Sequence, residues 1–588
     1  MKMKGTESFV QVLKNEGVDT VFGYPGGYVI DIFDRLYDQD DIEVVLPRHE
    51  QGAIHAADGY ARSTGKVGVC LVTSGPGATN LVTGIATANY DSIPLVCFTG
   101  QAPRSLIGND AFQEIDIVGV VRNISKFTIM VRQRKDLVRI MKEAFFIART
   151  GKPGPVVVDL PKDMMLEEDE DDFDQPVSIR GYKPNTKVHE GQIKRAMEML
   201  REAKRPLFLV GGGVKLSCAG RLMTTLMDST GVPAVTTLMG KGAIPSGHPL
   251  YYGNAGMHGF YVANMAIKEC DLLFSIGTRF SDRITGKIEE FAKNAKIIHV
   301  DIESSSISRN IKVDVPIVAD AGAAIHEMLK RAQYCEIDPW RKQLETWKTE
   351  HPMVQQRCSD KLSPEAVMRE IGRRFKDGII VTDVGQHQMW AAQYIGMTGR
   401  NQFLTSGGLG TMGYGFPAAI GAQLGNPDKQ VVCVTGDGGF QMNMQELATA
   451  MAYELPITVC ILNNSYLGMV RQMQHLFYDK RFSKTCLCWR KSCEKRCGDI
   501  SEKCPPYLPD FVKLAESYGT LGIRVFDQEQ MESAFDQAAA HKTGPTLIEF
   551  VIDPNELVLP MIMNGGTVDQ MIVDYPGLNS GSQKQEEK

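Results

Sequence analysis

The chain has 588 residues, of which 43% are apolar and 23% charged, with a formal net charge of −6. Its length exceeds what one hydrophobic core supports, so about three or four domains are expected, and the slightly acidic balance argues against nucleic acid or an anionic membrane as partner. The sequence shows neither a basic leader followed by an apolar run nor an apolar stretch long enough to span a membrane. We therefore expect a cytoplasmic protein whose 13 cysteines are mostly reduced.

A helix is predicted over residues 7–17, where apolar residues share one face and a glycine ends the pattern. A short strand follows, and Pro25, Gly26 and Gly27 then form a turn before a second helix. This turn has two interpretations. It is an ordinary connection between a strand and a helix, or its glycines let a bulky ring approach the main chain.

Residues 42–101 alternate strand, helix, strand, helix and strand, which predicts a parallel, doubly wound α/β sheet. Glu50 stands where the first of these strands gives way to a helix, on which Ala56 and Tyr60 belong to a close-packing face. A carboxylate in the first turn of a helix is commonly a partner of the helix dipole. The position of Glu50 beside a glycine-rich turn keeps open the alternative that it is catalytic.

The run over 167–187 is acidic, then polar and proline-bearing, and we interpret it as an inter-domain linker rather than a binding tail. An amphipathic helix over 193–201 leads into a strand that ends in the glycines Gly211 to Gly213. This triplet resembles a nucleotide-binding turn, although the complete GxGxxG pattern is missing. Asp301 and Glu303 follow another buried strand, either as ribose-contacting carboxylates or in a solvated loop.

The segment from Val431 to Met469 predicts a strand, a glycine-rich turn, a helix and a second buried strand. Asp437 follows the first strand and Asn464 follows the second, 27 positions later, at the edge where parallel sheets bind ligands. Oxygen ligands beside glycines, whose amides can approach an anion, suit Mg²⁺ shared with a diphosphate. Another strand ends near Gln386 and His387; a lone histidine is more often packed than a ligand.

The two strand ends form the signature of thiamine diphosphate enzymes, and the chain from about Gly5 to Asp574 resembles the catalytic, large subunit of acetolactate synthase, also called acetohydroxyacid synthase. Further motifs carry this resemblance in order along the chain: GYPGG (23–27), RHEQGA (48–53), TSGPGATN (73–80), FTGQ (98–101), DAFQE (110–114), PGPVVVDLPKD (153–163), GTRFSDRITGK (277–287), SGGLGTMGYGFPAAIGA (406–422) and NGGTVDQM (564–571).

The resemblance implies three doubly wound parallel-sheet domains. They are a pyrimidine-binding domain (1–166), a linker (167–187), a central FAD-binding domain (188–335), a second linker (336–362), a domain for thiamine diphosphate and Mg²⁺ (363–556) with a cysteine-rich insertion (484–509), and a C-terminal tail (557–588).

The activity implied is the condensation of two pyruvate molecules into 2-acetolactate and CO₂, or of pyruvate with 2-oxobutanoate, at the first common step of valine, leucine and isoleucine biosynthesis. The cofactors implied are thiamine diphosphate, Mg²⁺ and FAD, the last of them structural because the reaction has no net redox step. The resemblance further implies a homodimer or homotetramer whose active sites are shared between subunits, and a small regulatory subunit as partner.

The resemblance implies that Glu50 bonds to N1′ of the thiamine aminopyrimidine, on a cofactor molecule whose diphosphate is held by the other subunit. The bond to N1′ favours the imino tautomer, whose nitrogen removes the C2 proton. Arg279 is implied to recognise the carboxylate of the second oxoacid, and Met412 to wedge beneath thiamine. The other residues implied at the reacting groups or along the substrate channel are Gly27, Gln101, Phe112, Lys162 and Met473.

The residues implied to bind thiamine diphosphate are Tyr24, Pro25, Gly26, Glu50, Gln386, His387, Gly410, Met412, Gly436, Gly438, Gly439, Leu467, Gly468 and Met469. Those implied to bind FAD are Lys152, Gly211, Gly212, Gly213, Thr236, Leu238, Met239, Met257, His258, Gly277, Thr278, Arg279, Asp301, Ile302, Glu303 and Asp320. Those implied to bind the metal are Asp437, Asn464 and Tyr466.

Two single residues depart from the family pattern. Lys152 stands where the family usually has an arginine that touches FAD; lysine keeps the charge but loses the planar fork, which puts this contact in doubt. Met473 stands where most members have a tryptophan that favours 2-oxobutanoate as second substrate. Because methionine is flexible, we predict weaker discrimination in favour of 2-oxobutanoate.

A third departure is the insertion over 484–509, which gathers five cysteines in one basic loop: Cys486, Cys488, Cys493, Cys497 and Cys504. The loop is reduced and flexible, or its thiols bind zinc or an iron–sulfur cluster, or they act as a redox switch. No pair has the C-x-x-C spacing of common metal sites.

Two other functions compete with this interpretation. A related thiamine enzyme is one, although glyoxylate carboligase lacks a carboxylate at the position of Glu50, and a pyruvate oxidase would turn over its flavin with oxygen. A catalytically silent cofactor-binding or assembly subunit is the other, and the presence of Glu50, Asp437 and Asn464 argues against it.

Overall fold

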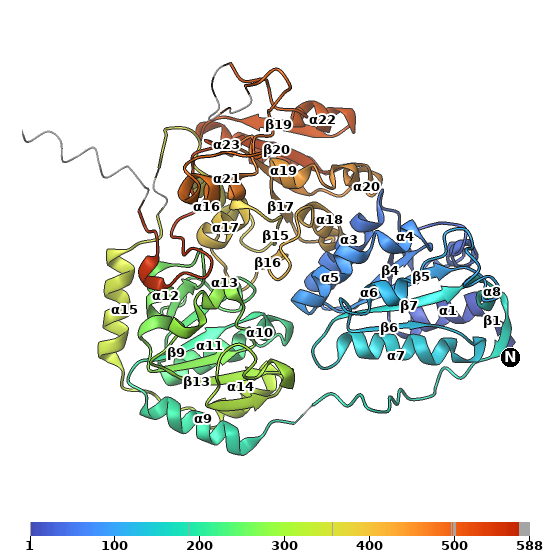
Figure 1. Cartoon of the computed structure of the whole chain (residues 1–588), viewed down its shortest axis with the longest axis horizontal. Helices are drawn as coiled ribbons and strands as arrows, with labels where there is room; N and C mark the ends of the chain where they lie inside the picture. Colours follow the sequence, from blue (N-terminus) through green and yellow to red (C-terminus); the bar gives the residue numbers. More distant parts are fainter. Residues whose placement is uncertain are drawn as a thin grey trace, which may run out of the picture.

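Three parallel sheets of six strands each organise the chain, one in each predicted domain. The computed structural model describes residues 2–185, 187–354, 357–494, 497, 501 and 503–574. Figure 1 shows the first domain (blue) beside the middle domain (green), with the last domain (yellow to red) lying across both. The predicted α/β class, with three doubly wound parallel sheets, is therefore confirmed.

The first sheet has the strand order β3-β2-β4-β5-β7-β6. Its strands are β2 (Thr20–Tyr24), β3 (Glu43–Val45), β4 (Gly68–Val72), β5 (Leu95–Gln101), β6 (Phe127–Met130) and β7 (Pro155–Pro161). Helices cover both faces: α1 (Gly5–Asn15), α2 (Ile30–Tyr37) and α7 (Leu137–Arg149) pack on one, α3 (Glu50–Thr64) and α5 (Val82–Asp91) on the other. Strands covered on both faces become continuous apolar runs, as in β4 and β5.

The middle sheet has a different order, β11-β10-β9-β12-β13-β14. Its strands are β9 (Pro206–Val210), β10 (Ala234–Thr236), β11 (Tyr251–Asn254), β12 (Leu272–Ile276), β13 (Lys296–Asp301) and β14 (Val315–Val318). The main helices around it are α9 (Glu190–Glu202), α10 (Gly212–Leu216), α11 (Gly220–Thr230), α12 (Tyr261–Glu269) and α14 (Ala321–Leu329). One hydrophobic cluster includes residues of the strands and of these helices.

The last sheet repeats the order of the first, β16-β15-β17-β18-β20-β19. Its strands are β15 (Ile379–Thr382), β16 (Gln402–Thr405), β17 (Val431–Gly436), β18 (Thr458–Asn463), β19 (Leu521–Val525) and β20 (Thr546–Val551). Its helices include α16 (Pro364–Arg374), α17 (Gln386–Tyr394), α18 (Gly415–Gly425), α21 (Gly468–Phe477), α22 (Phe511–Ser517) and α23 (Glu529–Ala540).

The single helix predicted after Gly439 is instead broken into α19 (Asp437–Phe440), a 3-10 turn (Met444–Glu446) and α20 (Leu447–Ala452). Polar side chains at the breaks bond to distant segments. Asn443 donates from Nδ2 to the carbonyl oxygen of Gly413 at 2.7 Å, and the buried Glu446 carboxylate accepts the amide of Arg48 at 3.0 Å. These tertiary bonds replace the regular helix that local periodicity predicts.

Helices α3 and α18 join the first domain to the last (Figure 1). Their backbones touch, because a β-carbon added to Gly59 would lie 2.0 Å from the carbonyl oxygen of Ala418, and one added to Gly421 would lie 1.8 Å from that of Ala56. The close-packing face predicted for α3 is therefore this domain contact.

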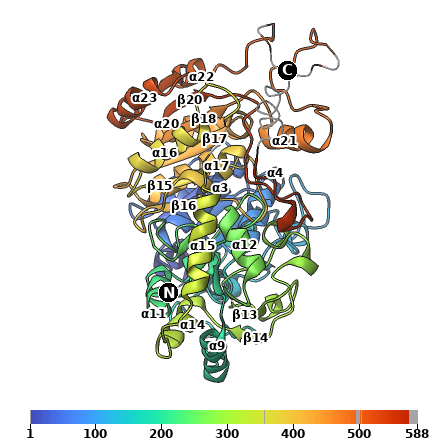
Figure 2. The same ribbon diagram turned by 90° about the vertical axis from the view of Figure 1, so that its left-hand side faces the viewer.

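Both predicted linkers contain regular structure. Residues Glu168–Glu170 form β8, which pairs antiparallel with β1 (Lys2–Lys4). The second linker contains α15 (Asp338–Glu350), which packs beside α12 on the outside of the middle domain (Figures 1 and 2). Among the residues described, no helix has the length and apolar character needed to cross a membrane.

Candidate active site

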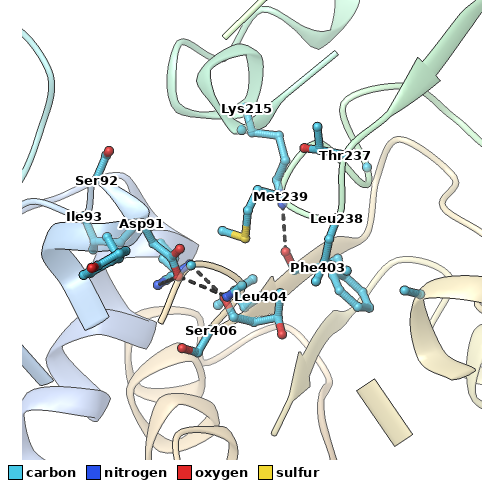
Figure 3. Close-up of a pocket in the computed structure, with 18 of the residues that line it drawn as sticks. Asp91, Ser92, Ile93, Lys215, Thr237, Leu238, Met239, Phe403, Leu404 and Ser406 are labelled. Atoms are coloured by element: carbon cyan, nitrogen blue, oxygen red, sulfur yellow. Dashed lines mark hydrogen bonds and ion pairs between the residues drawn. The ribbon is translucent and has the colours of Figure 1, made fainter. Parts of the chain in front are cut away.

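A cavity of about 1900 Å³ is lined by all three domains. Figure 3 shows part of it, with Asp91, Ser92 and Ile93 from the first domain facing Lys215, Thr237, Leu238 and Met239 from the middle and Phe403, Leu404 and Ser406 from the last. Lys215 donates from Nζ to the carbonyl oxygen of Phe403 at 2.8 Å and so links the middle domain to the last. The cavity lies at the carboxyl ends of β9, β12, β15 and β17, because the residues that follow these strands line it.

Asp437 and Asn464 lie in this cavity at the ends of the neighbouring strands β17 and β18. The Asp437 carboxylate accepts the amides of Gly438 at 2.9 Å and Ser465 at 2.7 Å, so the turn after β18 is tied to the end of β17. Burial raises the pKa of Asp437 to about 7. A cation at this edge would reverse that penalty, so the buried carboxylate fits a metal ligand.

Gln386 and His387, the first residues of α17, line the cavity beside this edge. Gln386 is fully bonded within the chain: Oε1 accepts from Nδ2 of Asn464 at 3.0 Å, and Nε2 donates to the side chain of Gln472 and the carbonyl oxygen of Glu556, both at 3.0 Å. The buried His387 has no partner for Nε2 within the described chain, and burial lowers its pKa to about 3. A neutral ring beside the cavity with one nitrogen unbonded is suited to bind a ligand.

The glycine-rich segment over 406–415 is held against this edge by Asp383, a residue that the sequence did not single out. Its carboxylate accepts the amides of Gly413 at 3.0 Å and Gly415 at 2.8 Å. The segment brings Gly410 and Met412 into the cavity, and a β-carbon added to Gly438 would lie 3.0 Å from Leu467 and 3.8 Å from Met412. The sequence does contain a signal for Asp383, because this residue follows the buried strand β15 as Asp437 follows β17.

The middle-domain end of the cavity lies where the strand order reverses, between β9 and β12. This order is the one common in dinucleotide-binding sheets, which bind ligands at the reversal. The glycines there pack backbone on backbone: a β-carbon added to Gly211 would lie 2.1 Å from the carbonyl oxygen of Gly277, and Gly277 has φ of 65°. His258 is half-buried, and its inaccessible Nδ1 lacks a hydrogen-bond partner among the described residues, as expected where a ligand is to be added.

Charged residues gather near this end. Arg279 donates from Nη1 to the carbonyl oxygen of Tyr90 at 2.6 Å, which joins the middle domain to the first. Burial and the charge of Arg279 lower the pKa of Lys152, while burial raises the pKa of Asp301 to about 6. Lys152 therefore lies among Arg279, Asp301 and Glu303, with its charge partly offset by the two carboxylates.

The structure brings nearly all residues predicted for FAD, the diphosphate and the metal into this one cavity. Gly211, Thr236 and Glu303 are not among its lining residues. Thr236 is buried, and its hydroxyl is bonded to Tyr251 and Asn254. Asp320 lines the cavity, but its carboxylate caps α14 by accepting the amide of Ala323 at 2.9 Å.

A second predicted group lies outside the cavity, on the first domain. Its members sit at the carboxyl ends of strands of the first sheet: Tyr24, Pro25, Gly26, Gly27, Glu50, Gln101 and Lys162. Glu50 accepts at Oε2 from Nδ2 of Asn80 at 2.9 Å, and Lys162 donates to the carbonyl oxygen of Gly27 at 2.9 Å. The structure thus separates Glu50 from Asp437 within one chain.

Gln101 differs from the rest of this group because its side chain is only 1% exposed. Its Nε2 donates to the carbonyl oxygen of Ile115 at 2.8 Å and to the carboxylate of Asp159 at 3.0 Å, and its Oε1 accepts the amide of Ala102 at 2.8 Å. Both amide hydrogens are therefore used inside the first domain. Phe112, in contrast, is 80% exposed.

Comparison with known proteins agrees with this division into three domains. Residues 3–120 match the thiamine pyrophosphate enzyme N-terminal TPP binding domain, 193–328 the central domain, and 383–550 the C-terminal TPP binding domain. The chain is 44% identical over 582 residues to the acetolactate synthase isozyme 3 large subunit of Escherichia coli (strain K12), covering 97% of this chain and 98% of that protein. The chain belongs to the acetolactate synthase large-subunit family of thiamine pyrophosphate enzymes.

Other members of the acetolactate synthase family match over a similar length. The probable acetolactate synthase large subunit of Methanococcus aeolicus is 45% identical over 591 residues, covering 97% of this chain and 95% of that protein. The acetolactate synthase large subunit of Haemophilus influenzae is 43% identical over 584 residues, covering 98% and 99%. Both thiamine-binding domains of the family are present, with Glu50 in the N-terminal one and Asp437 and Asn464 in the C-terminal one.

Proposed function

We propose that the protein is a thiamine diphosphate-dependent acetolactate synthase, which condenses two pyruvate molecules into 2-acetolactate and CO₂ at the first common step of valine, leucine and isoleucine biosynthesis. The observation that carries the proposal is the buried pair Asp437 and Asn464 at adjacent strand ends of the shared cavity, in a chain related along its length to acetolactate synthase large subunits.

Asp437 and Asn464 would hold Mg²⁺, with Tyr466 beside them, and the glycines Gly436, Gly438 and Gly439 would receive the diphosphate. The buried carboxylate of Asp437 supports this, because its raised pKa marks an anion that a cation would stabilise. The free Nε2 of His387 supports a contact to the same ligand. Gln386 would act through Asn464, since their side chains are bonded to each other.

When bound, thiamine diphosphate supplies the electron sink for decarboxylation of a 2-oxoacid. Around it, Met412 would fill the space next to Gly438, and Arg279 would receive a substrate carboxylate with its guanidinium. Glu50 would hold a proton on its carboxyl oxygen and exchange it with the aminopyrimidine. The long thioether of Met473 would line the space for the second oxoacid, 2-oxobutanoate included.

Glu50 would come to this site from a second copy of the chain. Within one chain it does not line the cavity, and it stands with Gly27 and Lys162 on a separate sheet edge. A homodimer, or a homotetramer built from such dimers, would place this edge over the cavity of the partner. A small regulatory subunit and a cytoplasmic location belong to the same proposal.

FAD would occupy the middle-domain end of the cavity. The order of the middle sheet, the glycine contact of Gly211 with Gly277 and the free nitrogen of His258 fit a dinucleotide. Lys152 would offer its charge there without the planar fork of an arginine. Because the condensation has no net redox step, the flavin would be structural.

The test is an assay of purified protein with pyruvate, thiamine diphosphate, Mg²⁺ and FAD, in which acid converts acetolactate into acetoin for detection. We expect acetoin that depends on thiamine diphosphate and Mg²⁺, without oxygen consumption in proportion to pyruvate used. Stoichiometric oxygen uptake would indicate an oxidase instead, and cofactor binding without any product would indicate a silent subunit.

A further inference from the structure

Glu446 places a buried carboxylate of the last domain against the segment that leads into Glu50. It ends the 3-10 turn Met444–Glu446 and is only 1% exposed, and its two oxygens accept the amide of Arg48 at 3.2 and 3.0 Å. The hydroxyl of Thr449 donates to the same carboxylate at 2.6 Å. Because Arg48 precedes Glu50 by two residues, the carboxylate joins the last domain to the start of α3.

The first turn of α3 leaves room for this carboxylate. A β-carbon added to Gly52 would lie 2.3 Å from Oε1 of Glu446, so any larger residue at this position would push the carboxylate away. A negative charge beside the unpaired amides at the start of a helix is favourable. Burial raises the pKa of Glu446, and the bond from Thr449 opposes this rise. The carboxylate is therefore enclosed in the contact between the two domains.

Tyr453 holds the other end of the same segment. Its hydroxyl donates to the carbonyl oxygen of Val44 at 3.1 Å and accepts the amide of Leu46 at 2.9 Å. Tyr453 and Glu446 stand at the two ends of α20. The residues between β3 and α3 thus rest on one short helix of the last domain.

Glu446 also lies close in sequence to the predicted metal edge, nine residues after Asp437. Bonds within this stretch keep it compact. Gln441 donates from Nε2 to the carbonyl oxygen of Asp437 at 3.3 Å, and the amide of Glu446 donates to the carbonyl oxygen of Asn443 at 3.1 Å. One short stretch of chain therefore contains a predicted metal ligand and the support of the segment before Glu50.

We propose that Glu446 is a positioning residue for Glu50, because it fixes the start of α3 and so sets where the Glu50 carboxyl meets the cofactor held by a second copy of the chain. The inference rests on the proposed function for the role of Glu50 and for the shared site. It assigns Glu446 to the site that its chain completes in the partner, whereas Asp437 belongs to the site of its own chain.

The position of this carboxyl matters because proton transfer requires hydrogen-bond distance. Glu50 is the first residue of α3, so a shift of the first turn moves its carboxyl directly. Glu446→Gln replaces one acceptor oxygen by a donor and removes the charge, which weakens the bond to the amide of Arg48. A displacement of about 1 Å at a catalytic group can lower a rate by about a hundredfold.

The first measurement is exchange of the C2 proton of bound thiamine diphosphate for deuterium. It uses the full chain with its cofactors and without pyruvate, and NMR of acid-quenched samples gives the rate. Glu446→Gln should slow this exchange, and lower kcat for acetolactate, by about tenfold. Calorimetry should find that thiamine diphosphate and Mg²⁺ bind as in the wild type.

Glu370→Gln is the matched control for this substitution. Glu370 lies on α16 of the same domain and is half-buried, and its carboxylate bonds to Arg373 and Arg374 of its own helix. The control therefore removes a paired carboxylate of the last domain without touching α3. Its exchange rate should equal that of the wild type.

Gly52→Ala tests the same contact from the first domain, and it keeps the test open if Glu446→Gln folds poorly. The added β-carbon displaces the Glu446 carboxylate, while alanine favours the helix more than glycine does. Exchange should again slow by about tenfold. The double variant should be no slower than either single variant, because both remove one contact. Multiplied effects would show two separate contacts and would overturn the inference.

Mixed dimers, isolated with two different tags, identify the site that Glu446 serves. Paired with Asp437→Ala, the Glu446→Gln chain supplies an intact Asp437 and meets a Glu50 whose support is intact. About half of the wild-type activity is therefore expected. Paired with Glu50→Gln, the Glu446→Gln chain supplies the remaining Glu50 without its support, so activity should be about tenfold lower than in the first pair.

Three results would overturn the inference: wild-type exchange in Glu446→Gln, loss of cofactor binding in that variant, and the reverse order of the two mixed dimers. The last would assign Glu446 to the metal edge of its own chain. Failure of the proposed function has different signs. Slowed exchange in Glu446→Gln, with no acetoin from pyruvate even in the wild type, would reject the activity and leave the positioning role standing. Low activity of both mixed dimers would reject the shared site, and the exchange rates would still decide the role of Glu446.

Discussion

Asn80 donates a hydrogen bond of 2.9 Å from Nδ2 to Oε2 of Glu50, and this pair lies at the first residue of α3, outside the cavity that contains Asp437. The bond holds the carboxylate at the sheet edge next to Gly77, whose added β-carbon would lie 3.4 Å from Oε1. The Glu50 side chain is thus oriented by its own domain, while the residues predicted to bind the diphosphate, Asp437 among them, line a cavity that does not include Glu50.

Replacement of this carboxyl is the most direct test of its role. Glu50→Gln keeps the size of the side chain and removes the ionisable group, so we expect kcat for acetolactate to fall by about a hundredfold or more. The Mg²⁺ dependence of thiamine diphosphate binding should stay unchanged, because Asp437 and Asn464 are intact. Steady-state rates and calorimetric binding together separate these effects.

Glu190→Gln is the matched control for that substitution. Glu190 is the first residue of α9, as Glu50 is of α3, but it lies on the surface of the middle domain. The control should retain the wild-type rate. If Glu50→Gln were as active as Glu190→Gln, Glu50 would be only a partner of its helix dipole.

The separation of Glu50 from Asp437 predicts complementation between two inactive variants. A mixed dimer of Glu50→Gln and Asp437→Ala contains one site with both residues intact and one with both replaced. Equal co-expression should therefore restore roughly a quarter of the wild-type activity, because half of the dimers are mixed and each has one good site. Two differently tagged chains purified in tandem isolate the mixed dimers, which should show roughly half of the wild-type activity.

The control mixes Glu50→Gln with a tagged copy of itself, which should stay inactive. Activity that never rises above this control, although the tags prove that mixed dimers exist, would place the complete site within a single chain. In that case the first domain of each chain would have to close over the cavity of the same chain.

Strand ends are the part of the site that sequence can predict. Alternation of buried strands with helices indicates parallel sheets, and in such sheets the carboxyl ends share an edge. This rule predicts that Asp437, Asn464 and His387 lie close together, and the structure places all three in one cavity. The alanine face of α3 is likewise predictable, because close helix contacts need small residues.

Features that depend on contacts between distant segments could not be predicted. The position of Asp383 after a buried strand does not reveal its bond to Gly413, and Glu446 breaks a helix by bonding to Arg48. The bonds from Thr485 and Leu487 to Leu467 and Ser465 join two irregular segments. In all these cases tertiary bonds override local propensity.

Met473 provides a test of substrate choice. It lies on α21 and lines the cavity. Met473→Trp should shift the product ratio toward 2-aceto-2-hydroxybutanoate by roughly tenfold when pyruvate and 2-oxobutanoate compete, because a rigid ring gives the longer oxoacid a better surface. Met473→Leu, which changes shape without adding a ring, should leave the ratio near that of the wild type. An unchanged ratio in the tryptophan variant, measured by chromatography of both products, would show that Met473 does not select the second substrate.

The contact between the first and last domains predicts a large effect on stability. Arg62 is buried, pairs with Asp58 at 2.5 Å and Asp91 at 2.9 Å, and donates to the carbonyl oxygen of Thr405 at 3.0 Å. Arg62→Met leaves two buried carboxylates without their cation and should lower the free energy of unfolding by about 3–5 kcal/mol.

The control for this substitution is Arg139→Met, since Arg139 forms exposed ion pairs with Asp136 and Glu143. Its loss should lower the free energy of unfolding by at most about 1 kcal/mol, and urea titration of both variants provides the measurement. Equal losses of unfolding free energy in the two variants would mean that the buried ion pairs of Arg62 stabilise the fold no more than the exposed ion pairs of Arg139.

His55, also in α3, makes the stability of this contact depend on pH. Its ring packs edge-on against Tyr414, neither nitrogen has a hydrogen-bond partner within the described residues, and burial, then the charge of Arg62, lowers its pKa to about 3. Below about pH 6.5 the unfolded chain binds a proton at His55, whereas the folded chain does not. The free energy of unfolding therefore decreases by about 1.4 kcal/mol per pH unit, down to about pH 3.

His55→Phe keeps the ring contact and removes the titration. The variant should therefore gain stability over the wild type as pH falls, by about 2–3 kcal/mol between pH 6.5 and 4.5 in urea unfolding at each pH. His326→Phe, on the exposed surface of α14, should follow the wild-type profile. A difference between His55→Phe and the wild type that stayed constant with pH would show that His55 accepts a proton in the folded state, and hence that its ring is hydrated there.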